Sequence, residues 1–275
     1  MTAAEDSFRA GELAQSLDQL QADIRQHPSD AKLRIFLAQL LMVLGQWDRA
    51  LTQLEVMKDM DASTLPMVRT YQAAIACERL RQSIFAGERT PLVFGDVQSW
   101  LALLIQSLAL LSKGQLLQAS ELRAQALEDA PTSSGTLNGK PIEWVADADS
   151  RLGPVLETLI NGKYYWMPMN RVSRVAIEAP CDVRDLVWIP AQLTLVNGGE
   201  VAALIPTRYP NSECEEDAQI RMARRTDWRS LAGESYLGTG QRILATESME
   251  IGLLDLRELV LNSPAPLPEP SQGEN

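Results

Sequence analysis

Histidine is almost absent from this chain, whose 275 residues contain only His27. Enzymes that use a Ser-His-Asp triad or a Cys-His pair need a histidine beside the nucleophile. His27 lies directly before Pro28, far along the chain from the serines and cysteines of the C-terminal half. The chain also lacks an HExxH zinc motif. We therefore predict that His27 is a surface turn residue without a catalytic role.

Cysteine is scarce as well, with Cys77, Cys181 and Cys214 as its three members. Three widely separated cysteines match neither a disulfide framework nor a zinc-binding spacing, and they fit a reducing cytoplasm. The stretch SSGTLNGKP resembles a phosphate-binding loop, but Gly135 and Gly139 are one residue too close together. We predict no cofactor and no metal.

Basic residues are outnumbered, since 25 Lys and Arg against 36 Asp and Glu give a net charge of −11. Because phosphate contacts are made by Lys and Arg, this balance argues against nucleic acid and against an anionic membrane surface. The most apolar run, Trp100 to Leu111, is too short for a bilayer, which needs about 20 residues. The first residues carry two acids and no apolar run. We predict a cytoplasmic protein.

The N-terminal half carries a degenerate repeat. Gly11 and Gly45 lie 34 residues apart, and Gly114 stands about two further periods along, each followed by a similar pattern of Leu and Ala. A 34-residue period is typical of tetratricopeptide-like pairs of helices. We predict three to four helical hairpins over residues 1–131, stacked around a concave groove, although the unit near 65–95 has Arg79 in place of the turn glycine. This half should be almost entirely helical.

The composition changes after residue 131. Residues 132–144 are rich in Ser, Thr, Gly and Pro, which predicts a linker. Residues 145–262 contain short β-branched runs, and LTLV-NGG-EVAALI is typical of a β-hairpin. The sequence thus predicts two domains, α followed by α+β with an antiparallel sheet. Residues 263–275 contain four prolines and predict a disordered tail.

Aromatic residues form only 5% of the chain, yet three stand together in the stretch NGKYYWMP. Because side chains alternate along a strand, Tyr164 and Trp166 should face one way and Tyr165 the other. Trp166 is the better core candidate, and Tyr165 the better surface candidate. Further Arg, Trp and Tyr residues follow in short polar motifs such as DVRDLVW and PTRYP.

Three roles are open for this polar and aromatic set. Its arginines could pair with Asp182, Asp185 or Asp227 and hold a small sheet together. Tyr, Trp and Arg are also the common hot-spot residues of partner-binding surfaces. Catalysis is the third role. The candidate partner-binding residues are Tyr164, Tyr165, Arg184, Trp188, Arg208, Tyr209, Arg224 and Arg242.

The run LINGKYYWMPMNRV, followed by APCDVRDLVWIPAQLTLVNGGEVAALIPTRYP, ARRTDW and GTGQR, resembles the ImpE/SciE/TagJ family of type VI secretion accessory proteins. The resemblance implies a cytoplasmic, non-enzymatic protein. It also implies binding to the small subunit of the contractile sheath (TssB) through an amphipathic N-terminal helix, which links the sheath to recycling by the ClpV unfoldase. An acidic chain would suit a partner helix edged with Lys or Arg. Two alternatives remain: a generic helical-repeat scaffold or co-chaperone, and an enzyme acting on an anionic substrate.

Overall fold

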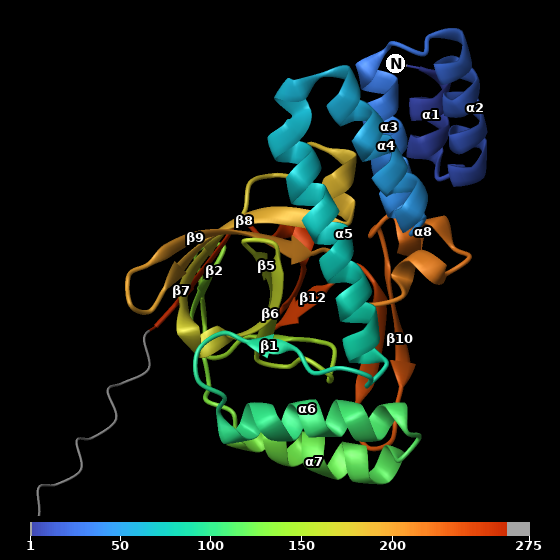
Figure 1. Cartoon of the computed structure of the whole chain (residues 1–275). Helices are drawn as coiled ribbons and strands as arrows, with labels where there is room; N and C mark the ends of the chain where they lie inside the picture. The colour runs from blue at the N-terminus through green and yellow to red at the C-terminus, as the bar shows by residue number, and fades with distance from the viewer. Residues whose placement is uncertain (1, 263–275) are drawn as a thin grey trace, which may run out of the picture.

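The computed structural model describes residues 2–262, in which a helical N-terminal region packs against a large curved sheet (Figure 1). The expected order of an α region followed by an antiparallel-sheet domain is confirmed. The N-terminal helices are α1 Ala3–Ala10, α2 Leu13–Gln26, α3 Ala31–Val43, α4 Trp47–Met60, α5 Leu65–Phe85, α6 Ser99–Ser112 and α7 Leu116–Asp129, with a 3-10 turn, η1 Ala62–Thr64.

Three helical hairpins form, α1–α2, α3–α4 and α6–α7. Gly11, Gly45 and Gly114 lie between the paired helices with φ of 86°, 67° and 73°. Side chains rarely adopt this left-handed region, which explains why glycine recurs there. Ala38 and Ala50 are both buried where α3 packs against α4.

The unit near residues 65–95 does not form a hairpin. The single helix α5 runs through Arg79, because no glycine or proline interrupts the chain between Pro66 and Phe85. Figure 1 shows α1–α4 at one end of α5 and α6–α7 at the other, so the hairpins do not stack into one continuous array. The hairpins therefore do not line the single concave groove that the repeat predicted, because α5 separates the first two hairpins from the third (Figure 1).

The loop after α5 carries a short strand, β1 Leu92–Val93, which pairs in parallel with residues 165 and 166. The N-terminal half is thus almost entirely helical, as expected, with β1 as its two-residue exception among the described residues. The loop gains its backbone partners from the sheet, since Phe94 N also donates to the carbonyl of Trp166 at 3.1 Å.

The main sheet has nine strands in the order β1-β6-β5-β9-β8-β7-β14-β2-β3. All neighbouring pairs except β1–β6 are antiparallel, and β8–β9 is the expected hairpin. Its remaining strands are β2 Gly135–Leu137, β3 Lys140–Ile142, β5 Val155–Ile160, β6 Lys163–Pro168, β7 Val172–Ala176, β8 Trp188–Leu195, β9 Glu200–Pro206 and β14 Glu258–Leu261.

The predicted linker 132–144 is wrong as a structural description. It supplies β2 and β3, and β2 pairs with β14 near the C-terminal end of the described chain. The tail predicted at 263–275 lies outside the described residues.

Smaller elements complete the C-terminal region. Two strands form one ribbon, and three more form a second small sheet. These elements are β10 Thr226–Ser230 with β11 Tyr236–Gly240, then β4 Ala146–Asp147, β12 Ile243–Ala245 and β13 Glu250–Gly252, the helix α8 Ala218–Arg221, and the 3-10 turns η2 Met169–Arg171, η3 Val183–Leu186, η4 Ser212–Cys214 and η5 Leu253–Asp255.

Two apolar cores lie on opposite faces of the main sheet. The first joins the helices to the outer face of the sheet and includes Tyr164 and Trp166, while the second fills the inner face and includes Met167. The predicted alternation along β6 is confirmed, because Tyr165 packs with the second core. Among residues 2–262, no helix combines the length and apolar character needed to cross a bilayer.

Candidate functional site

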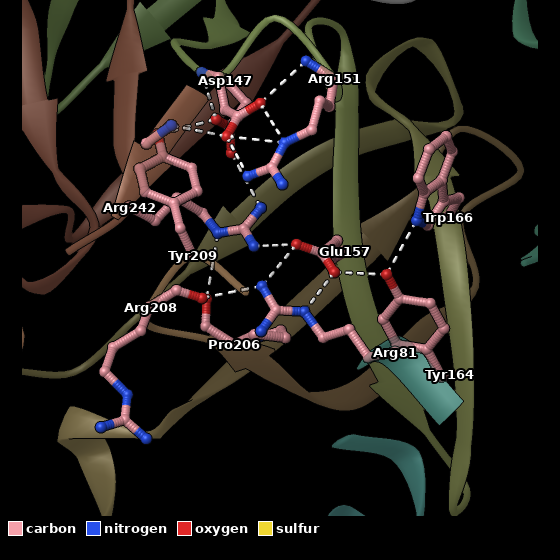
Figure 2. Close-up of polar contacts among 12 residues, drawn as sticks. Arg81, Asp147, Arg151, Glu157, Tyr164, Trp166, Pro206, Arg208, Tyr209 and Arg242 are labelled. Carbon is pink, nitrogen blue, oxygen red and sulfur yellow. Dashed lines mark hydrogen bonds and ion pairs between the residues drawn. The ribbon is translucent and has the colours of Figure 1, made fainter. Parts of the chain in front are cut away.

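Ionised side chains are buried where α5 meets the sheet, and we call them the buried charge cluster. Its acids come from α5, β4 and β5, and its two arginines come from α5 and from the residue before β12. All are at most 5% exposed. Figure 2 shows most of them converging between the strands. The cluster consists of Glu78, Arg81, Asp147, Glu157 and Arg242, with the phenols of Tyr164 and Tyr209.

Glu157 is at the centre of the cluster, on the outward face of β5. Arg81 donates to both of its oxygens, from Nε at 2.6 Å and from Nη2 at 2.9 Å. Arg242 and the hydroxyl of Tyr164 donate to it as well (Figure 2). Burial by itself would raise the pKa of Glu157, but the two arginines outweigh burial and hold the pKa well below its usual range. Glu157 is therefore ionised in the folded protein.

Asp147 occupies the other side of Arg242. It accepts from Arg242 Nη1 at 2.8 Å, from the Tyr209 hydroxyl at 2.9 Å and from the backbone amide of Asp149 at 2.9 Å. Burial raises the pKa of Asp147 to about 7, with a further contribution from the neighbouring carboxylate of Asp149 and opposition from Arg242. Asp147 thus titrates close to neutral pH, whereas Glu157 does not.

The cluster joins elements that are distant in sequence. Arg81 also donates to Glu78 at 2.9 Å and to the carbonyl of Arg208 at 2.8 Å, and Trp188 Nε1 donates to Glu78 at 3.1 Å. Arg242 Nε donates to the carbonyl of Pro206 at 3.1 Å. The charged groups of the cluster are paired with one another. The cluster therefore acts as a structural connection between α5 and the sheet.

The structure does not bring the eight predicted partner-binding residues onto one surface. Five of them are buried, in the cluster or beside it, where a docking partner has no access. The buried five are Tyr164, Trp188, Arg208, Tyr209 and Arg242. The burial of these five residues does not fit the partner-binding role that the sequence suggested for them.

The hydrogen bonds of Arg208 explain why it is buried. Its guanidinium donates to the carbonyls of Met42 at 3.4 Å and Val43 at 2.8 Å, at the last turn of α3, and to the carbonyl of Arg221 at 2.5 Å. The final carbonyls of a helix lack partners within the helix, and a cation is favourable there. Arg208 thus attaches the sheet domain to the second hairpin.

The other three candidates retain some exposure. Tyr165 is half-buried, with its ring edge-on to Phe94 at 5.8 Å, because the inner face of the sheet has an apolar core of its own. Arg184 is half-buried over the ring of Tyr71 at 5.3 Å, and its Nε lies 3.4 Å from Asp182. Arg224 is exposed and donates to the carbonyl of Arg9 at 2.9 Å.

A large open groove lies between α5 and the outer face of the sheet, and we call it the α5–sheet groove. Its volume is about 960 Å³. The floor is formed by Pro190 and Gln192 of β8 with Ala202 and Leu204 of β9. The rim consists of Arg69, Thr70 and Ala73 of α5 on one side, with Glu178, Cys181, Arg184, Asp185 and Arg257 around the rest.

Sequence reasoning missed this groove, although part of its signal was present. Along β8, Ile189 and Ala191 point into the inner core while Pro190 and Gln192 are exposed. That alternation predicts one uncovered face. It does not reveal that the first half of α5 borders the uncovered face, because the contact joins distant parts of the chain.

Other chemical groups sit apart from these features. His27 is exposed at the C-terminal end of α2, as expected. Cys77 is buried with its Sγ 3.4 Å from the carbonyl of Gly162, and burial raises the pKa of its thiol to about 11. In the part of the chain that the structure describes, no group of three or more His, Cys, Asp or Glu is placed to hold a metal ion.

Comparison with known proteins identifies relatives of this fold. The sequence model of the ImpE protein family matches residues 139–260. Over 256 residues, 93% of this chain and 90% of the relative, the sequence is 49% identical to the type VI secretion system accessory component TagJ of Pseudomonas aeruginosa. The chain belongs to the ImpE/TagJ family. The crystal structure of protein VPA1032 from Vibrio parahaemolyticus matches with a TM-score of 0.86 at 25% identity, covering 95% of this chain and 98% of that one.

The ImpE segment, residues 139–260, contains the groove floor and three of the charged members of the buried charge cluster, Asp147, Glu157 and Arg242. The α5 residues Arg69 and Arg81 lie outside this segment. Groove and cluster are therefore both assembled from the ImpE segment and from the helical region that precedes it.

Proposed function

We propose that this protein is a non-enzymatic, cytoplasmic accessory component of a bacterial type VI secretion system. It binds the N-terminal helix of the sheath small subunit (TssB) and so modulates recycling of the sheath by the ClpV unfoldase. The observation that carries this proposal is the 49% identity to a type VI secretion system accessory component along nearly the whole of both chains.

The groove provides a physical means of binding. Helical segments dock by laying an apolar face into a groove on the partner. The α5–sheet groove has a mostly apolar floor, with Gln192 as its polar member, and a polar rim, which is the usual anatomy of a protein-binding surface. Its floor residues are exposed or half-buried while their neighbours on the inner face of the sheet are buried, so the groove can be occupied without disturbing the core.

The chemistry of the interior supports a non-enzymatic role. The ionised side chains of the buried charge cluster are directed at one another, and Glu157 alone accepts from three side chains. A general acid or base must reach a substrate atom at hydrogen-bond distance. Groups that are buried and mutually paired do not offer that access.

The test is direct binding of the purified full-length chain to purified sheath small subunit, measured by isothermal titration calorimetry. The matched control is the same subunit without its N-terminal helix. We expect saturable binding to the intact subunit and its loss with the control. Equal binding to both, or no binding to the intact subunit, would overturn the proposal.

A second measurement addresses recycling. ClpV-driven disassembly of sheath is followed by light scattering with and without the chain. We expect the disassembly rate to change with a dependence on concentration that matches the binding curve. An unchanged rate at saturating chain would contradict the proposed link to ClpV.

A further inference from the structure

At the floor of the α5–sheet groove, the described part of the chain leaves the outer face of β8 and β9 uncovered. Pro190 and Gln192 on β8 and Ala202 on β9 are all exposed, and Leu204 is half-buried. The first core covers the sheet mainly over β5, β6 and the start of β8, through Val155, Leu159 and Trp188 among others, and Leu204 of β9 packs at its edge. The rest of the outer face is a floor bounded by α5.

The dimensions of the groove match a short length of helix. A helix with its side chains is about 10 Å across and rises about 1.5 Å per residue. A cylinder of that width filling 960 Å³ is about 12 Å long, which corresponds to about eight residues or two turns. The short side chains of Ala73 on the wall and Ala202 on the floor leave room for such an element.

Arginine is the most frequent charged residue of the groove lining. Arg69, Arg184 and Arg257 line the groove, in a chain whose net charge is −11. Arg69 is exposed, and no ion pair among residues 2–262 includes it. Arg257 is also exposed, and within residues 2–262 its Nη1 donates to the carbonyls of Leu254 at 2.8 Å and Leu256 at 2.7 Å and to no carboxylate.

Acids also lie at or beside the rim, but among residues 2–262 none of them forms an ion pair with Arg69 or Arg257. The carboxylate of Asp185 is buried and accepts from the amides of Cys181 and Asp182, each at 2.9 Å. Asp182 is taken up by Arg184 at 3.4 Å. Glu178 remains as the exposed acid of the lining. The groove therefore presents two arginines without carboxylate partners at its edges.

We infer that the α5–sheet groove is the docking site of the partner helix and that this helix carries carboxylates, placed to meet Arg69 and Arg257, beside a face of small or apolar residues. The inference rests on the proposed function and assigns its site and the chemistry of its partner. It reverses the expectation drawn from the net charge of the chain, which favoured a basic partner helix.

Two matched pairs of variants test the site and the sign of the charge. Ala202→Trp fills the floor of the groove, and its control Ala124→Trp places the same side chain on the exposed side of α7. Arg69→Glu reverses the charge of the rim, and its control Arg229→Glu makes the same change on β10. All four positions are exposed, so a thermal melt should show each variant folded like the wild type.

Binding of the full-length chain to the sheath small subunit is then measured for each variant. Ala202→Trp should raise the Kd more than about tenfold, since a filled floor excludes the helix. Arg69→Glu should raise the Kd about three- to tenfold, the scale of replacing an exposed attraction with a repulsion. Added salt should reduce the difference in Kd between Arg69→Glu and the wild type. The screening length for charges falls from about 10 Å at 0.1 M to about 3 Å at 1 M.

The outcomes separate the site from the function. If the wild type does not bind the subunit, the proposed function fails. If it binds and both test variants bind like their controls, the function stands and the groove is not the site. Tighter binding by Arg69→Glu would show a basic partner helix and overturn the inferred charge. If the wild-type chain forms dimers and Ala202→Trp dissociates them, the occupant of the groove is a second copy of the chain. That result would also overturn the inference.

Discussion

Replacing Glu157 by Gln tests the buried charge cluster most directly. The substitution keeps the shape of the side chain and removes one negative charge from between Arg81 and Arg242. Both guanidiniums are at most 2% exposed, so water cannot solvate them in place of the lost carboxylate. Arg81 keeps Glu78 as a partner and Arg242 keeps Asp147.

The cost follows from the geometry. Glu157 accepts from Arg81 through both oxygens, at 2.6 and 2.9 Å, and also from Arg242 and Tyr164. Removing one partner of a buried pair typically costs about 3–5 kcal/mol, because an uncompensated charge stays buried. The remaining acids and the Gln carbonyl relieve part of this, so we expect a loss of about 3 kcal/mol in the free energy of unfolding. Domains have about 5–15 kcal/mol in total, so the loss is large.

Urea unfolding followed by tryptophan fluorescence measures this loss, since Trp166 and Trp188 both contact the cluster. Glu258→Gln is the matched control. Its carboxylate pairs with Arg174 at 2.8 Å with both side chains over 40% exposed, and such pairs contribute less than about 1 kcal/mol. If Glu157→Gln costs no more than Glu258→Gln, the cluster does not stabilise the fold as we argue.

Three further predictions concern other positions. Asp147 has a folded pKa of about 7 against 3.8 ordinarily, so its protonated form favours folding, and that stability is lost as pH rises from 4 to 7. The unfolding free energy of the wild type relative to Asp147→Asn should therefore fall by at most about 4 kcal/mol between pH 4 and 8 in urea titrations. A flat difference would contradict the assignment. Trp166→Ala should cost about 3–5 kcal/mol in the same assay, since Trp166 is fully buried, and a loss under 1 kcal/mol would exclude it from the core. Gly45→Ala should destabilise more than Gly114→Ala by thermal melting. Both glycines have positive φ, but a Cβ added to Gly45 would lie 2.5 Å from Glu213 Cγ. A Cβ added to Gly114 would have no neighbouring atom within 4 Å among the described residues. Equal losses would show that Glu213 moves aside freely.

The helical half was predictable where the sequence has local turn signals. Gly11, Gly45 and Gly114 mark the three hairpins because each needs a left-handed backbone. The same logic, applied strictly, predicts α5 as one helix, since Arg79 cannot substitute for a turn glycine. The period of the repeat favoured a hairpin there, and tertiary packing against the sheet favoured the long helix.

The linker was misread for a similar local reason. Asn138 and Gly139 have φ of 47° and 78° and connect β2 to β3 in a tight hairpin. Asn-Gly between two β-prone runs is a strong hairpin signal. The richness of the segment in Ser, Thr and Pro outweighed that signal.

The buried charge cluster had one sequence signal. Glu157 interrupts the run Val155–Ile160, which is buried along its whole length. An acid in such a strand requires a buried cation. Its partner Arg81 lies 76 residues away, however, and no pattern along the chain identifies which arginine it is. The groove was out of reach for the same reason, because α5 and β8–β9 meet only in three dimensions.

The two ends of the nine-stranded sheet bear on whether copies of this chain can aggregate through their strand edges. An unpaired strand edge can template pairing with another chain and lead to aggregation. Here one end is β1, two residues long and preceded by Pro91, and the other is β3, three residues long with Pro141 at its centre. Proline cannot donate a backbone hydrogen bond, so β3 cannot extend a ladder through Pro141. Both ends therefore resist edge-to-edge growth into larger sheets.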